Sequence, residues 1–166
     1  MDVFVEKIGI ISCGNQRWSC ALGRAGLGQK NTEGDGLTPL GRHAFGRVFW
    51  RSDRLSEPKT SLHCQPIVET MGWCDDPDQD DYNTLITLPH AGSFEELWRQ
   101  DHVYDLIVEL LYNTNPIVLG HGSAIFMHVA RPDFNPTEGC IALKQKDLLM
   151  LLTMLNENSV LIVDQK

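Results

Sequence analysis

The sequence lacks several features that mark well-known classes of protein. No apolar run approaches the roughly 20 residues that a membrane-spanning helix needs, so we expect no membrane insertion. Lysine and arginine form no cluster: there are 14 of them against 22 acidic residues, and the formal net charge is −8. Because duplex nucleic acid requires a basic surface that neutralises phosphates, we expect no nucleic-acid partner. No Cys-x-x-Cys pair occurs, which removes the commonest zinc and redox signatures.

No linker, repeat or low-complexity tract interrupts the 166 residues, which suffice for one ordinary domain with its own core. We therefore predict a single domain over residues 1–166. The segment 1–7 contains acidic residues where a signal peptide has its positive region, and the apolar stretch 8–11 is too short for the hydrophobic region. The five cysteines are an odd number, so at least one is unpaired in a monomer.

Short apolar segments separated by turn residues predict a mainly β fold. We expect strands over 3–11, 18–22, 44–50, 105–111, 117–119, 123–129 and 160–163. The first two are expected to pair through a tight turn at Gly14-Asn15. A loop over 75–81 must be exposed, because so many carboxylates cannot be buried together.

Two helices are predicted beside these strands. Ser93-Phe94-Glu95-Glu96 has the pattern of a capping box and leads into Leu97-Trp98-Arg99. A second helix is expected from about Lys146 to Asn156, because its leucines recur on a broad apolar stripe that suits a core. Many short strands with two helices indicate a β-sandwich or barrel with a helix packed on one side.

The chemical signal lies in residues 122–143. His128 ends a predicted buried strand, a loop with proline follows, and Gly139-Cys140 comes just before the second helix. A thiol is mostly protonated near neutral pH and becomes a nucleophile when an imidazole takes its proton. The backbone amides at Gly139 and Cys140 could face a developing oxyanion, and glycine lets a substrate approach closely. The residues alone indicate a Cys/His dyad, with a buried structural cysteine and histidine as the alternative.

The same stretch resembles the L,D-transpeptidase (YkuD-type) catalytic domain. It is most similar to a small-domain branch in which Gly-Ser-Ala-Ile-Phe-x-His, here 122–128, precedes Pro-Thr-x-Gly-Cys-x-Ala-Leu, here 136–143. Residues 30–41, with Thr-Pro-x-Gly at their end, resemble the strand-entry motif of the family. Further likeness in 72–83 and 97–99 extends the resemblance over most of the chain.

The resemblance implies a YkuD-type β-sandwich with one or two short helices packed alongside. It also implies that Cys140 is the nucleophile and forms a thioester with the acyl group of a peptidoglycan stem peptide. His128 would be the general base, oriented by a main-chain carbonyl, and Gly139 with the Cys140 amide would bind the oxyanion. The enzyme would use no cofactor and no metal, and we expect a monomer.

Two positions depart from the family pattern. Glu138 stands where the broader family usually has histidine, and a carboxylate there opposes thiolate formation unless it points away or pairs with a cation. Ala142 stands where an arginine often follows the motif and is credited with handling a substrate carboxylate. Arg131 is a candidate to replace that arginine. These departures leave the acceptor and the bond that is cleaved open.

Other candidates have weaker support. Trp73, Asp75, Tyr82 and Asn83 are expected, by resemblance, to line the cleft and contact substrate, and Glu138 is a further candidate for substrate contact. His121 is predicted to lie at the rim, on the same strand as His128 but facing the other way. The remaining histidines have no partner at ligand spacing and are expected at the surface, namely His43, His63, His90 and His102.

Rival functions remain open. A hydrolase of the same fold, an L,D-carboxypeptidase or endopeptidase, would resolve the thioester with water, and a catalytically silent wall-binding module would retain only the fold. A papain-like or NlpC-like hydrolase is disfavoured, because those enzymes place cysteine before histidine in the chain. Location is also open: the implied chemistry belongs to the periplasm or cell wall, whereas the first residues and the cysteine usage suit the cytoplasm.

Overall fold

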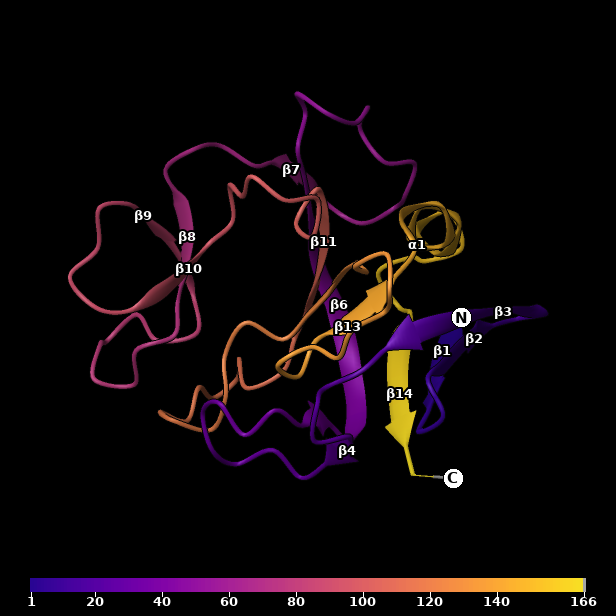
Figure 1. Cartoon of the computed structure of the whole chain (residues 1–166), viewed down its shortest axis with the longest axis horizontal. Coiled ribbons are helices and arrows are strands. Elements are labelled where there is room, and N and C mark those ends of the chain that lie inside the picture. Colours follow the sequence, from indigo (N-terminus) through magenta and orange to yellow (C-terminus); the bar gives the residue numbers. More distant parts are fainter. Residues whose placement is uncertain (166) are drawn as a thin grey trace.

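The computed structural model describes residues 1–165 and has a mainly β fold with one short helix, as predicted (Figure 1). In chain order the elements are β1 (Asp2–Glu6), β2 (Ile10–Cys13), β3 (Gln16–Ala21), β4 (Leu27–Gly28), β5 (Thr38–Pro39), β6 (Gly41–Trp50), β7 (Cys64–Pro66), β8 (Met71–Cys74), β9 (Leu85–Thr87), β10 (Phe94–Glu96), β11 (Leu106–Leu110), β12 (Phe126–Val129), β13 (Ile141–Leu143), α1 (Gln145–Leu152) and β14 (Val160–Asp164). No described helix is long and apolar enough to cross a membrane.

The largest sheet has nine strands in the order β11-β12-β13-β3-β2-β1-β14-β6-β7. Its long strand β6 pairs with β14 through Gly41–Ala44 and with β11 through Phe45–Trp50. Strand β11 stands at the start of this order and pairs there with β12, and it also pairs with β6 near the other end. These two pairings fold the sheet back on itself into two layers. The predicted β-sandwich with a helix alongside is confirmed.

The N-terminal strand pair differs from the prediction in one respect. The predicted strand over 3–11 is two strands, β1 and β2, which pair with each other antiparallel. Gly9 allows the reversal between them: its φ is +76°, and a Cβ there would lie 2.8 Å from the carbonyl oxygen of Cys20. The tight turn at Gly14-Asn15 between β2 and β3 is confirmed, because Cys13 pairs with Gln16. Parallel pairing of β1 with β14 places the first and last strands of the chain side by side.

Two predicted elements are wrong. The segment that begins at Ser93 forms strand β10 and no helix, because Phe94–Glu96 pairs with β8. The Ser93 hydroxyl and amide, expected to cap a helix, donate instead to the carboxylates of Asp75 and Asp76. The apolar run 117–119 is an exposed loop, and its Val118 backbone is satisfied by the side-chain amide of Asn113 rather than by a neighbouring strand.

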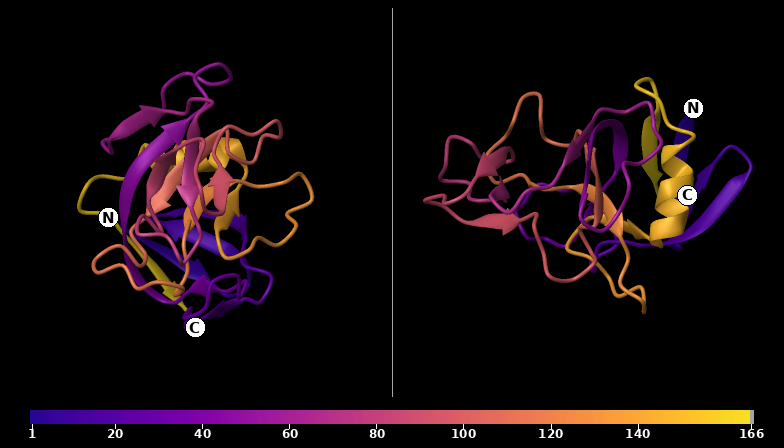
Figure 2. Two further views of the ribbon diagram at one scale, coloured as in Figure 1. Left: turned by 90° about the vertical axis from the view of Figure 1, so that its left-hand side faces the viewer. Right: turned by 90° about the horizontal axis from the view of Figure 1, so that it is seen from above.

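The second predicted helix is confirmed as α1, although it ends at Leu152. Leu148, Leu151 and Leu152 recur at helical spacing and are fully buried against the main core. That core lies between the layers of the large sheet, where β1, β11, β12, β13 and β14 contribute most of the buried aliphatic side chains. The three-stranded sheet β10-β8-β9 lies at the opposite end of the molecule from the β2–β3 hairpin (Figure 2).

A second apolar cluster joins the three-stranded sheet to the outer face of β11 and β12. It includes Trp73 from β8, Ile107 from β11 and Phe126 from β12, together with Cys140. The rings of Trp73 and Phe126 meet edge to face, with centroids 5.0 Å apart. The predicted nucleophile therefore lies at the edge of this second core and away from the main one.

Candidate active site

Strand alternation brings His128 and Cys140 to the same face of the sheet. His128 belongs to β12 and Cys140 immediately precedes its parallel neighbour β13, in which Ala142, two residues after Cys140, is in register with His128. Met127 and Ile141 point into the main core, so the alternate residues point outward. His128, Cys140 and Ala142 accordingly line one pocket of about 520 Å³.

Three segments form the walls of this pocket. Strand β10 supplies Phe94–Glu96, the segment before β11 supplies Arg99 and Tyr104, and the loop between β12 and β13 supplies the rest of the rim. The residues that line it are Phe94, Glu95, Glu96, Arg99, Val103, Tyr104, His128, Arg131, Asn135, Pro136, Thr137, Glu138, Cys140 and Ala142. The pocket volume is in the range of ordinary small-ligand sites.

The Cys140 thiol is protonated in this environment. Its Sγ donates to the carbonyl oxygen of Ala124 at 3.2 Å and accepts a hydrogen bond from the Phe126 amide at 3.4 Å. Burial raises the pKa of Cys140 to about 12, and the carboxylate of Glu95 acts in the same direction. The Phe126 amide opposes this shift, because it is a donor aimed at the sulfur.

His128 is a neutral imidazole of defined tautomer. Its Nδ1 lies 3.0 Å from the carbonyl oxygen of Val129, which can only accept, so Nδ1 carries the proton and Nε2 is free to act as a base. The ring packs edge to face on Tyr104, with centroids 5.4 Å apart. Burial lowers the pKa of His128 to about 4, and the nearby guanidinium groups of Arg99 and Arg131 also lower it.

The backbone before Cys140 requires glycine. Gly139 has φ +136°, and a Cβ at this position would lie 2.7 Å from the carbonyl oxygen of Leu37. The Gly139 amide donates to the Thr137 hydroxyl at 3.1 Å, and that hydroxyl donates to the Cys140 carbonyl at 2.6 Å. Thr137 thus closes the turn that holds Cys140, a role that the sequence pattern alone did not assign.

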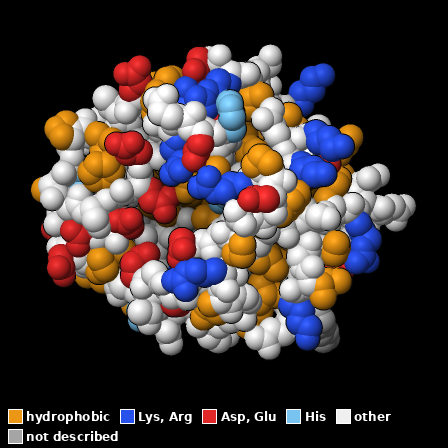
Figure 3. Space-filling model, viewed as in Figure 1, with side chains coloured by type: hydrophobic (Ala, Val, Ile, Leu, Met, Phe, Trp, Pro, Cys, Tyr) orange, Lys and Arg blue, Asp and Glu red, His pale blue; other side chains and the backbone are white. Residues whose placement is uncertain are grey.

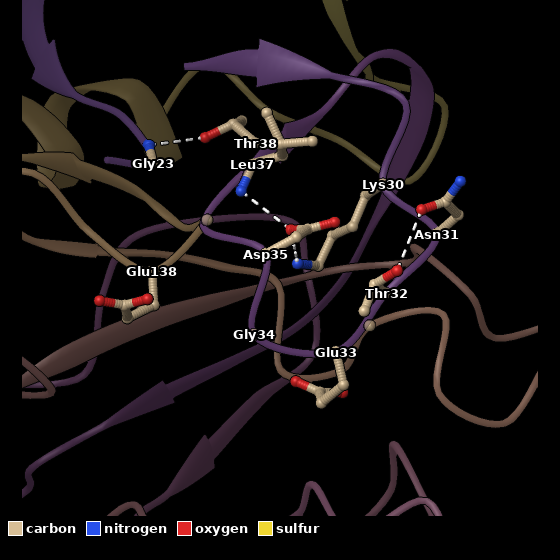
Figure 4. A network of polar contacts seen from close by, with 12 residues as sticks. Gly23, Lys30, Asn31, Thr32, Glu33, Gly34, Asp35, Leu37, Thr38 and Glu138 are labelled. Atoms are coloured by element: carbon tan, nitrogen blue, oxygen red, sulfur yellow. Dashed lines mark hydrogen bonds and ion pairs between the residues drawn. The ribbon is translucent and has the colours of Figure 1, made fainter. Parts of the chain in front are cut away.

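A buried ion pair supports this turn from behind (Figure 4). Lys30 Nζ lies 2.6 Å from a carboxylate oxygen of Asp35, and the Lys30 side chain is only 2% exposed. The same Asp35 oxygen accepts a hydrogen bond from the Leu37 amide at 2.9 Å. Because the Leu37 carbonyl contacts Gly139, the pair fixes the segment against which the Gly139 turn packs.

Glu138 lines the rim of the pocket but does not crowd the thiol. Its side chain is 73% exposed and pairs with Arg24 at 2.9 Å. In Figure 4 the carboxylate stands apart from the Lys30–Asp35 pair. A carboxylate at this position opposes thiolate formation unless it points away or pairs with a cation. Glu138 does both.

Two guanidinium groups border the pocket. Arg131 is half exposed and lies 3.7 Å from Asp101. Arg99, which sequence reasoning did not single out, makes two hydrogen bonds to Asp101, at 2.8 and 2.6 Å, and its guanidinium lies over the Tyr104 ring. This edge of the pocket therefore suits an anionic group.

Four residues that were expected to contact substrate do not line the pocket. Trp73, Tyr82 and Asn83 are buried in the wall behind it, and Trp73 Nε1 donates to Asn83 Oδ1 at 3.0 Å. The Tyr82 hydroxyl contacts Glu33 and accepts from the Gly122 amide. Asp75 accepts from Ser93 at the base of β10. Trp73, Tyr82 and Asn83 are therefore buried parts of the scaffold, and the half-buried Asp75 also lies outside the pocket lining, which corrects the expectation.

The histidines away from the pocket also need corrections. His43 is buried, with Nε2 at 3.1 Å from the Pro39 carbonyl, and burial lowers its pKa. His121 is exposed but precedes β12, so it shares no strand with His128. His63 and His102 are exposed as expected, whereas His90 is half buried beside carboxylates.

Comparisons with known proteins agree with this fold. The family of L,D-transpeptidase catalytic domains, YkuD, matches residues 13–163. Among solved structures, the helical cell shape determining protein Pgp2 from Campylobacter jejuni and a single-residue mutant of it match with TM-scores of 0.53 and 0.52. Each is 16% identical over 99% of this chain and 47% of the Pgp2 chain, so the chain spans about half of their length and the likeness shows the fold. Comparison with curated proteins finds no match.

Proposed function

Because the chain belongs to the L,D-transpeptidase catalytic domain family of cell-wall enzymes, we propose that it is a peptidoglycan L,D-transpeptidase that acts through a Cys140 thioester on stem peptides. The observation that carries this proposal is the common pocket of Cys140 and His128. The proton of His128 is fixed on Nδ1 by the Val129 carbonyl, which leaves Nε2 as a base in the pocket that Cys140 also lines. One catalytic domain over residues 1–166 contains the whole site.

The reaction begins from a neutral pair. When a stem peptide fills the pocket, the S–H bond turns from the Ala124 carbonyl toward His128 Nε2, which takes the proton as Sγ attacks the amide carbonyl. The negative charge of the tetrahedral intermediate moves to the former carbonyl oxygen, and the Cys140 amide is the donor that we assign to it. Because the Gly139 amide is engaged by Thr137, its contribution requires that this hydrogen bond be released.

Collapse of the intermediate breaks the amide bond. The imidazolium of His128 returns its proton to the leaving amine of the D-amino acid, and the acyl group stays on Cys140 as a thioester. An amine of a second stem peptide then attacks the thioester, forms the new amide and restores the thiol. Arg99 and Arg131 border the pocket, and we assign to them the terminal carboxylate of the leaving D-amino acid.

The first experiment tests for a live nucleophile. We expect a carbapenem to acylate the full-length chain and to increase its intact mass by one adduct. Cys140→Ala should give no adduct, whereas Cys64→Ser, which removes a half-buried cysteine outside the pocket, should react like the parent. If the parent forms no adduct and digests stem peptides no differently from Cys140→Ala, the protein is a silent module and the proposal is wrong.

Product analysis then determines the fate of the thioester. Incubation with disaccharide tetrapeptides should give cross-linked dimers together with one D-amino acid for each new bond. Free D-amino acid without dimers, or the splitting of dimers that are supplied, would identify the hydrolase alternative and overturn the transferase assignment. His128→Gln should lower the rate of acylation by about 10²–10⁴-fold, the usual contribution of a general base.

A further inference from the structure

A cluster of metal-ligating side chains lies outside the proposed active site. Cys74 ends strand β8, Asp81 lies in the loop that follows, and His90 comes after β9. One ligand atom of each, a thiol sulfur, a carboxylate oxygen and an imidazole nitrogen, lies within 4.8 Å of the other two. Within residues 1–165 no other group of three such side chains meets this criterion.

The imidazole of His90 is held by its backbone surroundings. Its Nε2 lies 3.1 and 3.2 Å from the two carboxylate oxygens of Asp81, and its Nδ1 faces Gly92, with the amide nitrogen at 3.1 Å and the carbonyl oxygen at 3.3 Å. Gly92 therefore offers both a donor and an acceptor to Nδ1. The Gly92 amide donates to Nδ1 in this structure, which places the ring proton on Nε2 toward Asp81; in a second tautomer the proton is on Nδ1, where the Gly92 carbonyl is the acceptor.

This second tautomer is the one that a metal ion needs. A ligating histidine commonly donates its other N–H to a backbone carbonyl, which fixes the ring and raises the basicity of the ligating nitrogen. Cys74 is fully buried at the base of the cluster, and Asp81 closes it on the side toward solvent. We propose that Cys74, Asp81 and His90 bind one Zn²⁺ ion, with a fourth position for water.

The donor set and the spacing favour zinc over harder cations. Sulfur, imidazole nitrogen and carboxylate oxygen suit Zn²⁺, whereas Ca²⁺ and Mg²⁺ prefer oxygen ligands alone. Tetrahedral Zn²⁺ with bonds of about 2.0–2.3 Å places its donors roughly 3.3–3.6 Å apart. The His90 and Asp81 atoms are already near this separation, and contraction of the other pairs from within 4.8 Å amounts to roughly 1.2–1.5 Å at most. As the Zn–S bond forms, the Cys74 thiol releases one proton to solvent.

The surroundings would attract a cation. The loop 75–81 contains five aspartates, including Asp81 itself. On the face shown in Figure 3, acidic side chains gather over the half that carries β8, β9 and β10 in Figure 1. A divalent ion at the cluster would also offset part of the repulsion among these carboxylates.

Bound zinc would stabilise one wall of the pocket. Cys74 pairs with Phe94 between β8 and β10, and the next residue of β10, Glu95, lines the pocket. The His90 ring packs edge to face on Phe94, with centroids 6.3 Å apart. The ion would thus join the loops on both sides of β9 to the strand pair that carries this wall.

Metal content of the full-length chain tests the proposal. Cys140→Ala is used as the background, because Cys140 and His128 are a second thiol and imidazole that could bind zinc. We expect one Zn²⁺ per chain after incubation and dialysis, and Co²⁺ substitution should give the near-ultraviolet thiolate-to-cobalt absorption together with the visible bands of a tetrahedral ion. Asp81→Asn and His90→Gln should each weaken Zn²⁺ binding by about 10–100-fold.

Matched variants separate the cluster from other ligands. His102→Gln alters an exposed histidine beside a carboxylate, and Cys64→Ser alters a thiol outside the cluster, so both should bind as the background does. Zn²⁺ at a hundredfold excess over its Kd should raise the Tm by about 5–10 °C in the background, and by much less in His90→Gln. Cys74 is fully buried, so Cys74→Ser can fail to fold. In that case Asp81→Asn and His90→Gln decide whether the cluster binds zinc.

Absence of stoichiometric metal, or binding that Asp81→Asn and His90→Gln leave unchanged, would overturn the proposal. These readouts are independent of catalysis. A failure of the zinc site therefore says nothing against the thioester chemistry, and a failure of acylation says nothing against the zinc site.

Discussion

The substitution Gly139→Ala tests how the turn before Cys140 is built. In the folded chain Gly139 has φ +136°, which residues with a side chain rarely adopt, and a Cβ would lie 2.7 Å from the Leu37 carbonyl oxygen. Backbone strain of this kind costs about 1–3 kcal/mol. Overpacking against backbone costs about 1–3 kcal/mol more, because the neighbouring segment is held by the Lys30–Asp35 pair. We expect a loss of about 2–6 kcal/mol in the free energy of unfolding.

Two other glycines separate these contributions. Gly34 has φ +74° but no atom within 4 Å of an added Cβ, so Gly34→Ala introduces strain alone. Gly23 has an ordinary φ, but its Cβ would lie 2.2 Å from the Gly36 carbonyl oxygen, so Gly23→Ala introduces overlap alone. For a chain of this length each 1 kcal/mol lowers the Tm by about 2–4 °C. Gly34→Ala should lower it by only a few degrees and Gly139→Ala by roughly 5–20 °C.

Thermal unfolding followed by circular dichroism, with carbapenem acylation measured well below the Tm, checks the reasoning. Gly139→Ala should slow acylation by about 100-fold even while folded, because a displacement of about 1 Å at the nucleophile is sufficient for this loss. Gly34→Ala should acylate at the parental rate. A Gly139→Ala protein with parental Tm and parental acylation would refute both the strain and the positioning argument.

Further predictions concern the charges at the site. Since burial lowers the pKa of His128 from 6.5 to about 4, the unfolded chain binds more protons between these values. The contribution of His128 to stability is complete above pH 6.5 and is lost as the pH falls toward 4, by up to about 3 kcal/mol. Urea unfolding at stepped pH should show this slope, and His128→Gln should flatten it; an unchanged slope would contradict the burial argument. Lys30→Met leaves the Asp35 carboxylate buried without its partner and should cost about 3–5 kcal/mol. Arg24→Met breaks only the exposed pair with Glu138 and should change stability by less than about 1 kcal/mol, so equal losses in the two variants would count against a buried pair.

Much of the fold could be predicted because its signals are local. Alternating or continuous apolar runs, such as that of β14, mark a strand wherever the sheet lies. The failures occur where a distant segment supplies the partner. Ser93 has the sequence of a helix cap, but its hydroxyl and amide are taken by Asp75 and Asp76, from a loop that no local pattern brings near. The apolar run at Val118 predicts a buried strand, whereas Asn113 satisfies its backbone in an exposed loop.

The residues of the candidate site also divide into those that local motifs identify and those that only the fold brings together. His128 and Cys140 could be identified because each lies in a short motif, and the alternation of β12 and β13 then places both on one face. Tyr104 and Arg99 lie well before these motifs, and only the folded chain brings them to the pocket. An aromatic residue such as Trp73 suits a ligand cleft as well as a core, so its sequence does not distinguish the two. Its burial in the structure does.

The protonation of the resting site bears on how its chemistry begins. Burial favours the neutral form of both groups and therefore disfavours a thiolate–imidazolium pair. In the proposed mechanism the substrate therefore contributes to the activation of Cys140. As Sγ attacks in that mechanism, negative charge passes directly to the carbonyl oxygen, and the imidazolium of His128 forms beside that charge instead of beside an isolated thiolate. The proton transfer and the attack consequently assist each other, as the hydrogen bond from the thiol to the Ala124 carbonyl is given up.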